Sequence, residues 1–105
     1  MKIMRVWHGW TAPENADAYE ALLRTKIFPW IERVDGYCGA FLLRRDAGDE
    51  VEFVTITRFD SLEAVKAFAG EDYETAVFYP EDDRFLVERD LHADHFDVEE
   101  RDPET

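Results

Sequence analysis

Four short segments of the chain have the residue pattern of β-strands. Ile3–Trp10 is rich in branched and aromatic residues and is too short for a typical helix. Tyr37–Arg45 and Val51–Phe59 are similar, and the polar run Asp46–Asp49 between them has the length of a hairpin turn. His92–Val98 alternates between apolar and polar residues. We therefore predict four strands, the second and third joined as a hairpin.

Two further segments have the spacing of amphipathic helices. The first begins at T-A-P-E, where the side chains of Thr11 and Glu14 can form a capping box. Pro29 should kink or end this helix near Phe28 and leave residues 30–34 as a trailing turn. The apolar stripe of this helix consists of Ala16, Tyr19, Leu23, Ile27 and Trp30.

The second predicted helix follows the third strand. Asp60 and Ser61 both suit an N-cap, and Glu63 can complete a capping box with Asp60. Gly70 should end this helix. Its buried stripe consists of Leu62, Val65 and Phe68.

The rest of the chain completes a β-α-β-β-α-β order. Residues 71–77 can form a further short helix before Pro80, and the charged run 81–90 is predicted to be a loop or a single turn. The order predicts an α+β, ferredoxin-like fold, in which both main helices cover one face of a four-stranded antiparallel sheet. We expect a single domain over residues 1–98 and a polar tail over residues 99–105.

The second strand is apolar on both of its faces. Alternation places Tyr37, Phe41 and Leu43 on one face and Cys38, Ala40 and Leu42 on the other. Since the helices cover only one face of the sheet, the second apolar face needs a partner. We predict that a second copy of the chain packs sheet against sheet, as in a homodimer.

Charge and cysteine content narrow the choice of partners and compartment. The 105 residues carry a net charge of −13, from 25 acidic and 12 basic side chains. Such a surface repels phosphates, so neither nucleic acid nor an anionic membrane is an expected partner. Cys38 is the only cysteine, which excludes an intrachain disulfide and a thiolate metal cluster. The amino terminus has no long apolar stretch, and we therefore expect a cytoplasmic protein.

From Ile3 to Val98 the chain resembles the antibiotic biosynthesis monooxygenase family, whose members are small dimeric α+β barrels. The resemblance rests on the segments MRVWHGW, PENADAYEALLRTKIFP, GYCGAFLLRR, VEFVTITRFDSLEAVKAFAGEDYETAVFYPEDDRFLVERD and HADHFDV. It implies a pocket in each subunit, between the sheet and the helices. It also implies a monooxygenase that oxidises a phenolic or polyketide-like molecule with molecular oxygen and needs no metal, flavin or other cofactor.

The resemblance does not extend to the haem-degrading branch of that family. That branch uses an Asn in the first strand, a Trp near the end of the third strand and a helical His. Here the only Asn is Asn15, at the start of a predicted helix, and the third strand ends in Arg58 and Phe59. No His occurs between Ser61 and Tyr79. The resemblance therefore implies no haem.

Six residues are candidates for the site. Arg58 and either Tyr73 or Tyr79 are expected to hold a substrate oxygen, since a guanidinium or a phenol can bind an anionic oxygen. His8 or His95 is expected to accept a proton. The sixth candidate, Trp10, is expected to stack on the substrate ring.

A structural reading of the same residues stays open beside the functional one. Arg58 can instead pair with an acid such as Glu52, and the tryptophans can pack in the core and the dimer face. His8 can meet His92 or His95 if the first and last strands are neighbours, but we predict no metal site.

Two other functions also stay open. One is a binding or accessory domain without chemistry, which a cavity below about 300 Å³ would favour. The other is an isomerase or lyase that works by proton transfer through a histidine.

Overall fold

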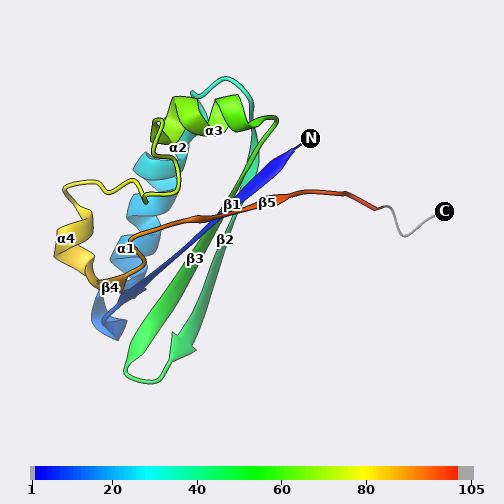
Figure 1. The fold of residues 1–105 in the computed structure, drawn as a ribbon. Helices are drawn as coiled ribbons and strands as arrows, with labels where there is room; N and C mark the ends of the chain where they lie inside the picture. The colour runs from blue at the N-terminus through cyan, green and yellow to red at the C-terminus, as the bar shows by residue number, and fades with distance from the viewer. Residues whose placement is uncertain (1, 102–105) are drawn as a thin grey trace.

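The computed structural model describes residues 2–101 and contains one antiparallel sheet with helices on one of its faces (Figure 1). The strands are β1 (Ile3–Thr11), β2 (Tyr37–Ala47), β3 (Glu50–Phe59), β4 (Leu86–Arg89) and β5 (Asp94–Asp97). Their order is β2-β3-β1-β4, and β5 also pairs with β1. This is the ferredoxin-like α+β arrangement predicted from the sequence.

The position predicted for one fourth strand is filled by two short strands. β4 pairs with the end of β1 at Gly9–Thr11, and β5 pairs with its beginning at Ile3–Val6. Between them the backbone leaves β1, because His92 forms a bridge with Thr75. The single strand predicted over 92–98 is therefore corrected to the shorter β5. The loop or single turn predicted over 81–90 is corrected only at β4, since a single helical turn occupies Asp82–Phe85.

The first helix is longer than predicted and changes its winding. A 3₁₀ turn at Pro13–Asn15 leads into α1 (Ala16–Leu22), a π-helical turn at Leu23–Ile27 and α2 (Phe28–Ile31). The Phe28 amide donates to the Leu23 carbonyl, five residues earlier. Pro29 cannot donate to the carbonyl four residues before it, and the wider π turn makes room for its ring. The helix therefore runs on to Ile31 instead of ending near Phe28.

The predicted capping box at Thr11 does not form. Thr11 is the last residue of β1, it is fully buried, and its hydroxyl oxygen has no hydrogen-bond partner among the described residues. The residue before the 3₁₀ turn is Ala12, which has no capping side chain. Thr11 is therefore part of the sheet and cannot serve as the helix N-cap.

The second helix, α3 (Leu62–Ala69), begins and ends as predicted. The Ser61 hydroxyl oxygen accepts a hydrogen bond from the Ala64 amide at 3.1 Å, and Gly70 follows the helix at φ +90°. Since Ser61 occupies the N-cap, the alternative box between Asp60 and Glu63 does not form.

Residues 71–80 form turns and no helix, contrary to the prediction for 71–77. The Ala76 amide donates to the Leu91 carbonyl, and the Ala93 amide donates to the Glu74 carbonyl. These bonds tie the segment to the stretch between β4 and β5. A short helix, α4 (Asp82–Phe85), follows instead.

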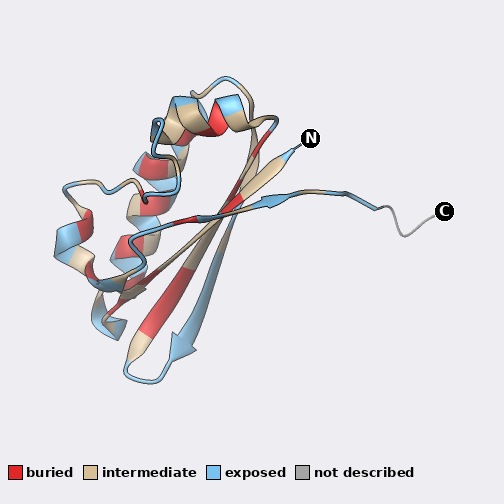
Figure 2. Ribbon diagram, in the orientation of Figure 1, coloured by how far each residue is buried: buried red, intermediate tan, exposed pale blue. Residues whose placement is uncertain are grey.

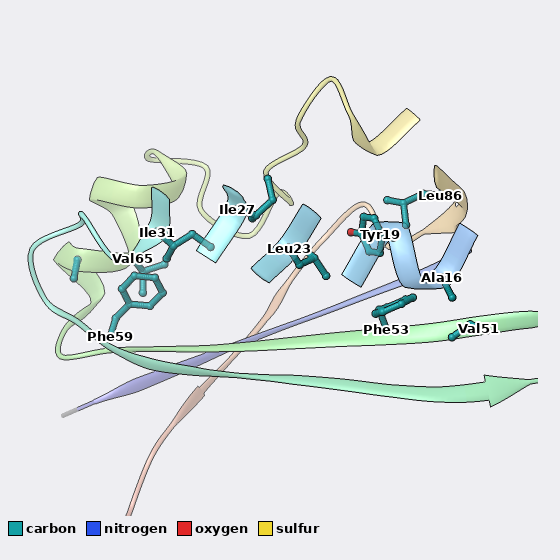
Figure 3. Close-up of a cluster of buried hydrophobic side chains, with 11 residues drawn as sticks. Ala16, Tyr19, Leu23, Ile27, Ile31, Val51, Phe53, Phe59, Val65 and Leu86 are labelled. Atoms are coloured by element: carbon teal, nitrogen blue, oxygen red, sulfur yellow. The ribbon is translucent and has the colours of Figure 1, made fainter. Parts of the chain in front are cut away.

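The hydrophobic core lies between the helices and one face of the sheet (Figures 2 and 3). Tyr19, Leu23 and Ile27 point from the first helix towards the sheet (Figure 3). Phe53 and Phe59 meet them from β3 and are fully buried. We call this side of the sheet the inner face. The remaining core residues are Ala16, Ile31, Val51, Ala64, Val65 and Leu86.

A β-bulge between Tyr37 and Gly39 shifts the phase of β2. Tyr37 packs against the core, whereas Phe41 and Leu43 point to the other face and are 53% and 47% exposed. The prediction that Tyr37 shares a face with Phe41 and Leu43 is therefore wrong. The extra residue at the bulge reverses the alternation that the prediction assumed.

No helix covers the opposite side of the sheet, which we call the outer face (Figure 1). The register places on it the even-numbered residues of β1 and β3 and the odd-numbered residues of β2 beyond the bulge. Its apolar members are Met4, Val6, Trp10, Phe41, Leu43, Val54, Ile56 and Phe96.

In the described residues, no helix is both long and apolar enough to cross a membrane. Residues 99–101 carry no helix or strand, and the rest of the predicted tail, 102–105, lies outside the described residues.

Candidate functional site

A cavity of about 60 Å³ lies between the first helix and the inner face of the sheet. Most of its wall is apolar and aromatic, and the segment after α3 contributes Val77 and Tyr79. Its polar or titratable side chains are those of Arg5, Tyr19, Thr55, Thr57, Tyr79 and Asp82. A mainly apolar cavity with a few converging polar groups is the usual form of a small-molecule site.

Arg5 brings a cation into this cavity from the middle of β1. It is only 5% exposed, and its Nη1 donates to the Tyr73 carbonyl at 2.5 Å. Its Nη2 donates to the Thr75 carbonyl at 3.2 Å. Burial lowers the pKa of Arg5 to about 10, so the guanidinium is still charged at neutral pH.

His95 and Tyr73 lie beside Arg5 but do not line the cavity. The Nε2 atom of His95 is 3.0 Å from Nη1 of Arg5, and the Tyr73 ring packs edge-on against the His95 ring at 5.1 Å. A guanidinium only donates, so Nε2 of His95 accepts and its proton is on Nδ1. Burial and the adjacent Arg5 cation lower the pKa of His95, which keeps the ring neutral. His95 therefore orients Arg5.

Tyr79 and Asp82 form a second polar group in the cavity wall. The Tyr79 amide donates to Oδ2 of Asp82 at 2.8 Å, and the Tyr79 ring packs on Trp30 with centroids 5.4 Å apart. Burial raises the pKa of the Asp82 carboxyl, which is only 3% exposed. Burial and the nearby Asp82 also raise the pKa of the Tyr79 phenol. Tyr79 can therefore donate a hydrogen bond, and the Asp82 carboxyl holds its proton more strongly than an exposed aspartate does.

Trp7 forms part of the cavity wall on the sheet side. Its Nε1 donates to the Asp90 carbonyl at 2.8 Å, which fixes the indole in place. A Cβ added at Gly9 would lie 2.4 Å from the Trp7 ring, so the ring lies directly over the Gly9 backbone. The absence of a side chain at Gly9 allows this position.

The other three predicted site residues lie on the outer face of the sheet, away from this cavity. His8 and Trp10 stack with ring centroids 6.1 Å apart, and His8 lines an open hollow of about 270 Å³. Arg58 lies over the Phe41 ring at 5.9 Å. His8 and His95 therefore lie on opposite faces, and the predicted meeting of these two histidines does not occur.

Arg58 has the acidic partner that was expected, but this partner is Glu100 and not Glu52. Its Nη2 donates to the Cys38 carbonyl at 3.1 Å, and its Nη1 donates to Glu100 at 3.3 Å. Glu52 instead accepts from Arg45 at 2.6 Å and lies 2.8 Å from Nδ1 of His8, and these two bonds lower the pKa of its carboxyl. Arg58 lies six positions after Glu52 on the same extended strand, which is too far for contact.

Sequence reasoning missed three cavity residues that the site uses, Arg5, Trp7 and Asp82. Arg5 interrupts an apolar strand just as Arg58 does, and its alternation with Trp7 could have placed it on the core side. Asp82 belongs to a charged run that reads as a solvated surface, and no sequence signal distinguishes it from Asp83. Only the start of α4 turns Asp82 inward.

The chain was compared with known proteins. No curated protein sequence matches it. Among solved structures it is similar to SnoaB, a cofactor-independent oxygenase from Streptomyces nogalater, with a TM-score of 0.66, 17% identity and 98% of each chain covered. It is also similar to the ActVA-Orf6 monooxygenase of Streptomyces coelicolor in complex with nanaomycin D, with a TM-score of 0.60, 14% identity, and 99% of this chain and 92% of that chain covered.

A third similar structure is Rv0793 from Mycobacterium tuberculosis, with a TM-score of 0.64, 19% identity, and 96% of this chain and 98% of that chain covered. At these identities the three structures establish a shared fold. The sequence itself matches the antibiotic biosynthesis monooxygenase family over residues 3–77, which is more than half of the chain. The protein therefore belongs to the antibiotic biosynthesis monooxygenase family.

Proposed function

We propose that the protein is a cofactor-independent oxygenase that acts on a small phenolic, polyketide-like molecule bound in the inner-face cavity. The observation that carries the proposal is the composition of this cavity, in which a buried carboxyl and a phenol converge within an aromatic wall. Membership of the family supports it, as does the similarity in fold to a cofactor-independent oxygenase.

The reaction needs only the substrate and molecular oxygen. Loss of the phenolic proton leaves an electron-rich ring, which reduces oxygen directly. One oxygen atom enters the ring as a carbonyl and the other leaves as water, so the substrate supplies the electrons and becomes a quinone.

Asp82 is the proposed proton acceptor. A base is most effective when its pKa is near the working pH, and burial moves the pKa of Asp82 in that direction. Tyr79 donates a hydrogen bond to the substrate oxygen, and Trp7 forms a flat wall beside the ring. His95 and Tyr73 act through Arg5, which they touch.

A polycyclic substrate requires the cavity to widen. Its volume of about 60 Å³ is below the roughly 300 Å³ that small-molecule sites usually have. The irregular segment 71–81 supplies part of the wall and is the part of the wall least restrained by helix or strand hydrogen bonds. We propose that this segment moves outward when the substrate enters.

Metal-stripped protein incubated with anthrone and oxygen provides the test. Oxygen uptake and anthraquinone absorbance should rise above the uncatalysed rate. Asp82→Asn should lower the rate by about a hundredfold, since general base catalysis contributes at least that much. Asp83→Asn is the matched control, because its side chain is 81% exposed and does not line the cavity. If no phenol in a broad panel reacts faster with the protein, the proposal is wrong.

The small cavity favours a second candidate, a binding domain without chemistry. In that case aromatic ligands should bind to the metal-stripped protein without consuming oxygen. Asp82→Asn should then leave the affinity within about threefold, since no proton is transferred. Calorimetry together with an oxygen electrode separates the two candidates.

We also propose that the protein is a homodimer that joins two outer faces. The support is the apolar outer face itself, with Phe41, Leu43 and Phe96 about half exposed. His8, Trp10 and Arg58 would then lie at the interface and not in the inner-face cavity. The lone Cys38 supports a reducing, cytoplasmic location.

A further inference from the structure

Arg5 is a buried cation without an acidic partner in residues 2–101, the part of the chain that the structure describes. None of the ion pairs among the described residues includes it. Its hydrogen-bond acceptors are two backbone carbonyls and a neutral imidazole nitrogen. The Phe68 ring, 5.4 Å from the guanidinium carbon, adds only a weak attraction. Burial of a charge is costly unless the charge is paired, so the buried Arg5 side chain reduces the free energy of unfolding.

The guanidinium still has hydrogen-bonding capacity. Two Nη1 hydrogens and one Nη2 hydrogen are used by Tyr73, His95 and Thr75. A guanidinium has five N–H groups, so the Nε hydrogen and the second Nη2 hydrogen have no partner among the described residues. Since Arg5 lines the cavity, a ligand there can accept these hydrogens.

The three partners also fix the guanidinium in one orientation. Two of the contacts come from the segment 73–75 and one comes from β5, so two separate parts of the chain hold the guanidinium. A guanidinium held in this way loses little side-chain entropy when a planar anion binds. The arrangement is therefore suited to an anionic oxygen.

We propose that the ligand of this cavity is an aromatic molecule that carries an anionic oxygen, a carboxylate or an acidic phenolate, and that Arg5 binds this oxygen. The inference rests on the proposed function, because it assumes that the inner-face cavity is the ligand site. It adds a substrate class, since neutral aromatic molecules of the same shape are selected against. Arg5 is thus a specificity-determining residue.

Titration calorimetry at pH 7.5 and low salt with 2-naphthoate and 2-naphthamide tests this selection. The two probes have nearly the same shape and differ in charge. Wild-type protein should bind 2-naphthoate at least about tenfold more tightly, the effect of one charge-assisted hydrogen bond. 4-Nitrophenolate, compared with 4-nitroanisole, shows whether a phenolate is accepted as well as a carboxylate.

Three variants connect the preference to Arg5. Arg5→Met should abolish the preference for the anion and leave the affinity for 2-naphthamide within about threefold. Arg5→Lys keeps the charge without the planar fork and should retain part of the preference. Arg24→Met is the control, because Arg24 is an exposed helix residue paired with Glu20, and it should behave as wild type.

Equal affinity of wild-type protein for the two naphthalene probes would overturn the inference and leave the proposed function standing. So would an anion preference that survives in Arg5→Met. If Arg5→Met does not fold, the comparison of the two probes on wild-type protein and on Arg5→Lys decides the question. If no probe binds, the inner-face cavity is not the ligand site, and the proposed function fails together with the inference.

Discussion

Two buried charged groups, Arg5 and Asp82, determine what the cavity can do. They come from opposite ends of the chain, and the acceptors of Arg5 are carbonyls and an imidazole, not a carboxylate. Asp82 accepts from a backbone amide of Tyr79 and not from a cation. Neither charge is neutralised by a direct bond to the other, and each can therefore act on a ligand.

The buried carboxyl of Asp82 should reduce stability as the pH rises. Burial raises its pKa in the folded state, so its full contribution to stability is present below the unfolded value near 3.8. That contribution is lost as the pH rises through the higher folded value. Asn does not ionise, so Asp82→Asn removes this pH-dependent loss. The free energy of unfolding of the variant minus that of wild type should therefore increase between pH 4 and pH 7. Urea unfolding across this range measures the difference, and parallel pH profiles for the two proteins would contradict the expectation.

Gly9→Ala should disturb the cavity through the Trp7 ring. The new Cβ would be 2.4 Å from that ring and would push it towards the cavity. We expect a loss of about 1–3 kcal/mol in stability and a shifted tryptophan fluorescence spectrum. In a Trp7→Phe background the same substitution should cost clearly less, because the shorter ring leaves room. Equal costs in the two backgrounds, measured by urea unfolding, would show that Trp7 is not the cause.

At the scale of elements, side chains and backbone compete for the same hydrogen bonds. β1 extends through Thr11, so Thr11 belongs to the sheet and does not cap the helix. β3 ends at Phe59, two residues before Ser61, and Ser61 can therefore cap α3. Pro29 converts one turn of the first helix to a π turn without ending it. In each case the sequence motif is local, but the neighbouring strand or helix decides whether its hydrogen bonds form.

Ser61→Ala should destabilise the protein by about 1 kcal/mol. The substitution removes the acceptor of the Ala64 amide at the start of α3. Ser61→Asp keeps an acceptor at this position and should remain close to wild type. Midpoints of urea unfolding compare the three proteins, and a loss of equal size in both variants would mean that packing and not capping is responsible.

At the scale of the whole molecule, the two faces of the sheet make different contacts. The inner face carries the core and the cavity, and the outer face combines apolar side chains with a buried Glu52 between His8 and Arg45. A chain of this size buries a limited share of its surface, so a shared outer face adds stability. The net charge of −13 favours an apolar contact over a charged one between two copies.

Leu43→Glu should convert the proposed dimer to a monomer. Leu43 is 47% exposed on the outer face, where a carboxylate on each copy would be buried in the proposed interface without a partner. Light scattering should give about twice 12.3 kDa for wild type and about 12.3 kDa for the variant. Leu91→Glu is the control, because Leu91 is 63% exposed and lies outside the outer face. A wild-type protein of about 12.3 kDa would overturn the dimer itself.

The sequence by itself determined the fold class and the order of the first three strands and the two main helices. The branched and aromatic run Val51–Phe59 and the helical spacing of Tyr19, Leu23 and Ile27 involve neighbours a few residues apart. Such patterns are local, and the structure follows them. The Ser61 cap and Gly70 stop were predictable for the same reason. Three of the predicted site residues, Tyr73, Tyr79 and His95, lie at or next to the cavity, although their roles there are still proposals.

Only the tertiary structure decided which faces meet and which charges are buried. One extra residue at the bulge after Tyr37 reverses a whole strand, and the bridge between Thr75 and His92 splits the last strand in two. The positions of Arg5 and Asp82 depend on segments more than sixty residues apart in the chain. Contacts of this range leave no local pattern, because they depend on the register and burial of complete elements.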